Sequence, residues 1–180
     1  MTLSDMQKVV IETIHTVVLR SSPKIGTCAA YCMSCEGWLK VEILDALTHQ
    51  FGKDDDVEIL PEHKHVDLVV TRAKERVWIE LKTFPCNYGV SGNPITNSIA
   101  GVVTDLEKLG RLVGPTSLGI AVWLAYSIPD ETPPGWSAHL RKVESAALRT
   151  ICSDRIRLWQ GHSAHLYIME ALTALETTVM

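Results

Sequence analysis

The chain has 180 residues, of which 46% are hydrophobic and 21% are charged, and its formal net charge is -4. This length and composition suit one folded domain with a full hydrophobic core and argue against a disordered protein. The acidic balance argues against a generic basic nucleic-acid coat protein, although an enzyme acting on nucleic acid can still bind through a local basic stripe.

The start of the chain and its cysteines indicate the compartment. The sequence contains no run of 18 apolar residues, and its first residues, with Asp5 and Gln7, lack a signal-peptide pattern. We therefore expect a cytoplasmic protein with no membrane partner. Five cysteines are an odd number for such a chain, so free thiols are expected rather than a disulfide framework.

The first half of the chain predicts two helices and then strands. Residues 4–20 repeat apolar side chains at helical spacing, with Ser4 as the N-cap, and the segment 21–26 ends this helix. A second helix is expected from about residue 29 or 34 to residue 50, followed by a short strand at 57–60.

The second half of the chain predicts further helices and strands. Residues 84–94 predict an exposed loop, 97–113 a helix capped by Thr96 or Asn97, and 118–126 a strand covered on both faces. A helix at 137–150 and strands at 156–159 and 165–169 follow. Together the elements predict a single α/β domain, residues 1–180, with a mixed central β-sheet flanked by helices.

Two extended segments dominate the middle of the chain. Residues 66–70 and 77–82 read as strands, and the charged stretch between them predicts a β-hairpin. Because successive side chains of a strand point to opposite faces, the apolar residues share one face. Asp67, Glu80 and Lys82 then converge on the other face.

This convergence indicates a metal site. Two carboxylates and one ammonium group on otherwise apolar strands are costly to bury unless they bind something. Mg²⁺ prefers oxygen ligands and is often held by one or two carboxylates. We therefore expect Asp67 and Glu80 to bind Mg²⁺ or Mn²⁺, and Lys82 to orient or deprotonate a metal-bound water.

Asp67, followed after a short hairpin by Glu80-Leu81-Lys82, resembles the active-site signature of the PD-(D/E)xK phosphodiesterase superfamily. Val66 stands where the family usually has proline, whereas the second half of the motif matches fully. The resemblance implies a restriction-endonuclease-like αβββαβ core at about 34–126, with an extra N-terminal helix at 4–20 and a C-terminal extension at 127–180.

The same resemblance implies the function. The chain is expected to be a metal-dependent nuclease that hydrolyses the phosphodiester backbone of nucleic acid, DNA rather than RNA, with Asp67, Glu80 and Lys82 as catalytic residues. Some members carry a further acidic ligand on the preceding helix, a role that falls here on Glu42, with Glu36 as the weaker competitor. Many such nucleases form homodimers in order to cut both strands.

Further polar side chains can contact a phosphate backbone, a kind of contact that positions a nucleic acid without reading its sequence. They lie at the hairpin tip and in the loop that follows, namely Arg72, Lys74, Arg76, Asn87, Tyr88 and Asn93. A charged hairpin tip is also ordinary surface chemistry, and both interpretations stay open at this point.

Three alternatives accompany this hypothesis. The missing proline and the acidic balance favour a catalytically silent module that binds nucleic acid or assembles with protein on the same fold. Cys28, Cys32 and Cys35 have spacing that suits a metal site in an unrelated α/β domain, or they are thiols on one face of a helix. His63 and His65 alternate with Asp67, so they are either imidazole ligands for a softer metal or surface groups.

Overall fold

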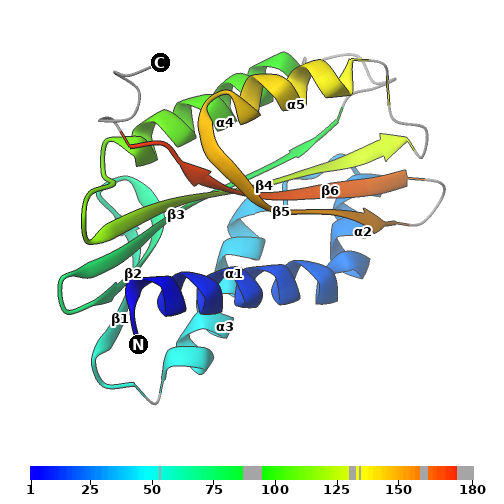
Figure 1. The fold of residues 1–180 in the computed structure, drawn as a ribbon. Coiled ribbons are helices and arrows are strands. Elements are labelled where there is room, and N and C mark those ends of the chain that lie inside the picture. The colour runs from blue at the N-terminus through cyan, green and yellow to red at the C-terminus, as the bar shows by residue number, and fades with distance from the viewer. Residues whose placement is uncertain (53, 87–94, 130–132, 134, 159–161, 174–180) are drawn as a thin grey trace.

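The computed structural model describes residues 1–52, 54–86, 95–129, 133, 135–158 and 162–173. Within these residues the chain forms one six-stranded sheet with the strand order β1-β2-β3-β4-β6-β5. Helices cover both faces of this sheet (Figure 1). The strands are β1 (Val57–His63), β2 (Val66–Arg72), β3 (Glu75–Pro85), β4 (Ser117–Pro129), β5 (Ala147–Arg157) and β6 (His162–Ala171).

The sheet is mixed. Strands β1, β2 and β3 form an antiparallel meander, β3 and β4 run parallel, and β6 pairs antiparallel with both β4 and β5. A parallel pair needs a crossover connection, which is supplied here by helix α4 (Ile95–Gly110). The expected α/β class, with a mixed sheet flanked by helices, is thereby confirmed.

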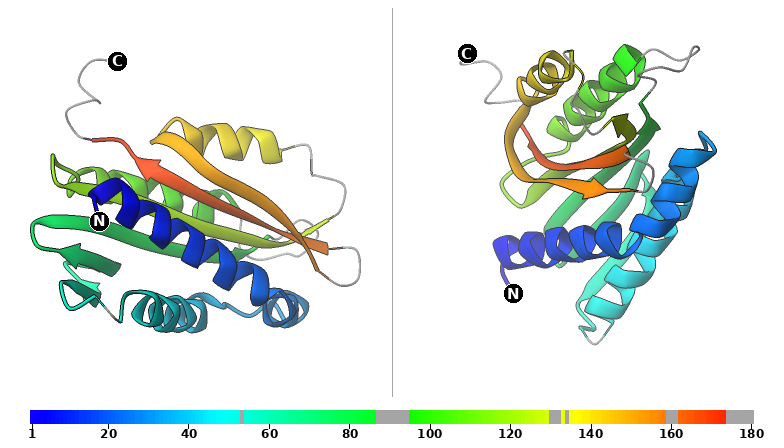
Figure 2. Two further views of the ribbon diagram at one scale, coloured as in Figure 1. Left: turned by 60° about the horizontal axis from the view of Figure 1, so that its bottom comes forward. Right: turned by 90° about the vertical axis from the view of Figure 1, so that its right-hand side faces the viewer.

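The helices form two layers on opposite faces of the sheet. Helices α1 (Leu3–Arg20), α2 (Ser22–Ala30) and α3 (Glu36–Phe51) lie on one side, and α4 and α5 (Trp136–Glu144) lie on the other (Figure 2). The side chains of β4 alternate between two hydrophobic clusters: Ile120 and Val122 pack with α1 and α3, whereas Ala121 and Trp123 pack under α4. The prediction that this strand is covered on both faces is therefore confirmed.

Four local predictions about helices are wrong. Helix α4 begins at Ile95 and ends at Gly110, so Thr96 and Asn97 lie inside it and neither is its cap. The N-cap of α1 is Thr2, which exchanges hydrogen bonds with Asp5 in a capping box. Helix α2 was not expected, because Pro23 reads as a helix breaker, yet proline fits the first turn, where its missing N–H has no partner to lose. The helix expected at 137–150 ends at Glu144, because residues from Ala147 onward pair with β6.

The outer strands of the sheet are irregular. The register between β5 and β6 shifts twice, between Ala147 and Arg149 and again between Thr150 and Cys152. On the opposite edge, β1 contains Pro61, which has no backbone N–H to donate. In the part of the chain that the structure describes, no helix is long and apolar enough to cross a membrane.

Candidate functional site

The candidate site lies at the open end of the β2–β3 hairpin, where the two strands separate. Their pairing runs from Arg72 and Glu75 at the tip to Leu68 and Ile79. Beyond that point the two strands are joined by a side chain: the Asp67 carboxylate accepts a hydrogen bond of 2.8 Å from the backbone N–H of Leu81. Asp67 is thereby fixed beside the segment that carries Glu80 and Lys82.

Glu80 is the most buried charged group of the site. Its side chain is 7% exposed and forms an ion pair with Lys108 of α4. Burial raises the pKa of Glu80 to about 7, with a further increase from the negative charge of Asp67, while the hydrogen bond from Lys108 acts in the opposite direction. This pKa already includes the effect of Lys108, so the buried carboxyl group would be still harder to ionise without that cation.

Helix α4 presents one flank to the strand that carries Glu80 and Lys82. Gly101, Asp105 and Lys108 are spaced at i, i+4 and i+7 along this helix and therefore share a side of it. A Cβ atom at Gly101 would lie 3.5 Å from Cε of Lys82, which is an ordinary van der Waals distance and places the Lys82 side chain against this side of α4. Burial raises the pKa of Asp105, whereas the positive charges of Lys82 and Lys108 lower it.

Helix α3 reaches the same place from the opposite layer. Nζ of Lys40 donates to Oδ1 of Asp67 at 3.1 Å and also pairs with Glu62 of β1. The hydrogen bond to Glu62 is the chief cause of the raised pKa of Lys40. Oε2 of Glu36 accepts a hydrogen bond of 2.9 Å from the backbone N–H of Thr83, next to Lys82.

The structure brings Glu36 to the group, but not Glu42. The Glu42 carboxylate is held by Nζ of Lys24 at 3.0 Å, by Nε1 of Trp38 at 3.2 Å and by Arg20 at 3.5 Å. These partners belong to α1, α2 and α3, so Glu42 is engaged on the outer side of this helical layer. Of the two acidic residues considered on this helix, Glu36 is the one that contacts the hairpin.

The basic residues at the hairpin tip lie at the other end of the strands from Asp67. Arg72 donates to the carbonyl oxygen of Met1 and lies 4.0 Å from Asp56. Lys74 and Arg76 are exposed. Since β3 advances about 3.3 Å per residue, the five residue steps from Glu75 to Glu80 separate the tip from the carboxylates. Asn87, Tyr88 and Asn93 lie outside the described residues.

The turn between β1 and β2 is tied to the site by helix α4. Lys64 and His65 adopt left-handed backbone conformations, with φ of 52° and 63°. The carbonyl oxygen of His65 accepts a hydrogen bond of 2.8 Å from Nζ of Lys108. His63 ends β1 and stacks on Trp78 with centroids 6.1 Å apart. Because His65 lies in the turn and Asp67 lies on β2, the two histidines and Asp67 do not continue one strand face.

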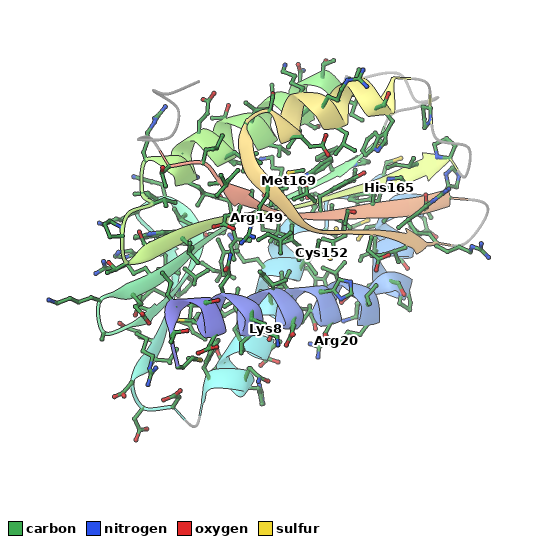
Figure 3. The ribbon with its side chains drawn as sticks, viewed as in Figure 1. Lys8, Arg20, Arg149, Cys152, His165 and Met169 are labelled. Atoms are coloured by element: carbon green, nitrogen blue, oxygen red, sulfur yellow. The ribbon has the colours of Figure 1, made fainter. Side chains whose placement is uncertain are left out.

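Aromatic side chains extend from Lys82 across the sheet beneath α5. Lys82 is the register partner of Trp123, whose ring stacks on Tyr167 with centroids 4.2 Å apart. His165 of β6, labelled in Figure 3, meets Trp136 of α5 edge-on with ring centroids 5.4 Å apart. Burial lowers the pKa of His165 to about 4, so this histidine is a neutral part of the core.

The three clustered cysteines do not share one helix, which corrects that expectation. Cys28 lies in α2, Cys32 is exposed at a left-handed turn with φ of 52°, and Cys35 is the buried N-cap residue of α3. All five cysteines of the chain are free thiols. Burial raises the pKa of Cys35 to about 11, so its thiol is protonated at neutral pH.

The chemistry of the assembled group is that of oxygen donors held next to ammonium groups. Among the described residues, no group of three or more His, Cys, Asp or Glu side chains is arranged to hold a metal ion. Instead, Lys40 neutralises Asp67 and Lys108 neutralises Glu80. The carboxylate oxygens are suitable ligands for Mg²⁺. A metal ion could bind them only by replacing one of the two lysine ammonium groups.

Sequence reasoning missed two residues of this group, Lys40 and Asp105. Asp105 lies one turn from Gly101 and three residues from Lys108, which is a helical spacing that could have identified it. Comparisons of the chain with protein-family models, with curated proteins and with solved structures found no match.

Proposed function

We propose that this protein is a divalent-metal-dependent phosphodiesterase that hydrolyses the backbone of nucleic acid, DNA rather than RNA, and that it belongs to the PD-(D/E)xK superfamily. The observation that carries the proposal is the position of Asp67. Its carboxylate binds the backbone N–H between Glu80 and Lys82 at the point where the hairpin opens. This contact holds two carboxylates and one lysine together between helices of both layers.

The residues have separate roles in this proposal. Asp67 and Glu80 would hold Mg²⁺ or Mn²⁺, and the bound ion would supply Lewis acidity for phosphodiester hydrolysis. Lys82 orients the attacking water and offsets the charge that develops on phosphorus. Glu36 fixes the backbone beside Lys82 through its hydrogen bond with Thr83.

Cleavage assays test the proposal. Labelled linear, nicked, branched and single-stranded DNA, and RNA, are incubated with the protein in Mg²⁺, Mn²⁺ or EDTA. Wild type is compared with Asp67→Asn and Lys82→Ala, and with Lys8→Ala as the matched lysine control. Lys8 lies on α1, on the face of the sheet opposite α4, and its side chain is 75% exposed (Figure 3).

We expect metal-dependent cleavage by wild type and Lys8→Ala, and loss of at least about 100-fold in Lys82→Ala, since general acid–base and electrostatic groups commonly contribute this much. A folded Lys82→Ala protein that cuts at the wild-type rate would refute the mechanism. The substrate that is cut fastest would identify the nucleic acid.

A second candidate function rests on the two ion pairs. Because Lys40 and Lys108 already neutralise Asp67 and Glu80, the site is also consistent with a silent module that binds nucleic acid or protein without a metal. The two candidates differ in their response to divalent ions. A metal site predicts a rise in melting temperature with Mg²⁺ concentration, whereas a silent module predicts none and cuts none of the substrates.

A further inference from the structure

The ammonium group of Lys108 is surrounded by oxygen atoms from three separate elements. It forms an ion pair with the Glu80 carboxylate of β3 and donates to the carbonyl oxygen of His65, before β2, at 2.8 Å. Oδ1 of Asp105, on its own helix, lies 3.9 Å away. One cation therefore sits among two carboxylates and a backbone carbonyl.

This set of atoms matches the preferences of a hard divalent ion. Mg²⁺ and Mn²⁺ take carboxylate and carbonyl oxygens and complete their shells with water. An ammonium group satisfies the same oxygens with weaker charge. The Glu80 side chain is 7% exposed, and a carboxylate buried to this extent is costly to leave without a cation, so one cation is expected to leave only as another arrives.

The ammonium group of Lys108 can move away from these oxygen atoms. Its side chain is 33% exposed, although its stem starts from a helix that packs on the sheet. A lysine stem has four rotatable carbon–carbon bonds, and its strongly hydrated ammonium group can swing into solvent without movement of the backbone. Glu80 and the His65 carbonyl stay in place when it does, because they belong to the sheet and its turn.

We propose that the Lys108 ammonium group occupies a divalent-cation position formed by Glu80, Asp105 and the carbonyl of His65, and that a metal ion binds there by displacing it. The inference rests on the proposed function, to which it adds two oxygen donors and an internal competitor. Asp67 lies next to this position and is neutralised separately by Lys40. Lys108 is thus a positioning residue that keeps the site ordered without metal.

Metal binding measured without nucleic acid tests the inference independently of cleavage. Free Mn²⁺ is followed by electron paramagnetic resonance during titration of wild type, Lys108→Met, Lys108→Gln, and Lys8→Met as the control. Melting temperatures are recorded in EDTA and in Mn²⁺. Lys108→Gln keeps a donor for the His65 carbonyl but removes the charge, so it serves if the methionine variant does not fold.

Removal of the Lys108 charge should lower the melting temperature in EDTA and raise the affinity for Mn²⁺. In EDTA the neutral variants should melt below wild type, because Glu80 loses its cation. They should bind Mn²⁺ on the order of ten-fold tighter, as expected for a typical coupling between competing ligands, and gain more melting temperature from it. Lys8→Met should match wild type in both. Addition of Asp105→Asn to Lys108→Met should reverse the tighter binding.

The possible results separate the claims. Equal Mn²⁺ affinity in wild type and in the Lys108 variants overturns the displacement inference and leaves the proposed metal site standing. If the double variant binds as tightly as Lys108→Met, Asp105 is not a donor and the cation position as stated is wrong. If neither wild type nor any variant binds Mn²⁺, both the inference and the metal-dependent function fail.

Discussion

Replacement of Glu80 by glutamine should make the stability of the protein less sensitive to rising pH. The folded state raises the pKa of Glu80 from 4.5 to about 7, so between these values the folded protein holds a proton that the unfolded chain has lost. Stability therefore falls as pH rises through this window. One pKa unit corresponds to about 1.36 kcal/mol, so the free energy of unfolding of wild type should fall by at most about 3 kcal/mol across this window. Glutamine does not ionise and contributes no such fall.

Urea unfolding in EDTA at intervals from about pH 4 to about pH 8 measures this effect. The quantity to plot is the free energy of unfolding of Glu80→Gln minus that of wild type, since groups common to both proteins cancel. We expect this difference to rise with pH by up to about 3 kcal/mol. Glu12→Gln, at an exposed residue of α1, is the control. A difference that stays flat across the range would refute the assignment of Glu80 as a carboxylate made costly by burial.

Three further predictions concern the core and the site. The lowered pKa of buried His165 means that wild type loses stability as pH falls below about 6.5. In His165→Phe the free energy of unfolding should therefore fall less between about pH 7 and about pH 4, by up to about 3 kcal/mol. Urea unfolding at both pH values measures this difference. Gly119→Ala should destabilise the protein by about 1–3 kcal/mol, since the added Cβ would lie 3.0 Å from Cβ of Leu109. Gly37→Ala, whose Cβ would have nothing within 4 Å, should stabilise it by about 0.5–1 kcal/mol. Equal effects of the two variants in thermal unfolding would contradict this. Glu36→Ala should slow cleavage by about ten-fold or more, the equivalent of about 1.4 kcal/mol of lost positioning, and Glu42→Ala should not; the reverse order would return the role to Glu42.

The strands were the more predictable part of the fold. The central hairpin and the β4 strand followed from alternation and from an unbroken apolar run, because those patterns report which faces are buried. Residues 147–150 were assigned to a helix, although they belong to β5. Their pairing with β6 is a contact distant in sequence, and it overrides local preference.

The candidate site was predictable where its residues lie on one hairpin, and not where they come from separate helices. The hairpin predicted that Asp67, Glu80 and Lys82 lie close together. The predicted strict alternation of faces does not hold around Asp67, because Val66 packs under α4 whereas Leu68 and Val70 pack with α1 and α3. The choice between Glu36 and Glu42 needed the helical angle. At about 100° per residue, Glu36 falls in the centre of the buried row of α3, whereas Glu42 lies about 120° from it. Lys40 joins the site through the packing of α3 on the sheet, a contact between elements that periodicity does not report. Asp105 shares one side of α4 with Lys108, and this helical spacing is its only signal in the sequence.

The irregular outer strands bear on how copies of the protein can associate. A flat, fully paired edge strand invites another chain to extend the sheet. Here the two register shifts twist β5, and Pro61 removes a donor from β1. Growth into continuous sheets or fibrils is therefore opposed at both edges, and we expect two copies of the chain to associate through other surfaces than the sheet edges.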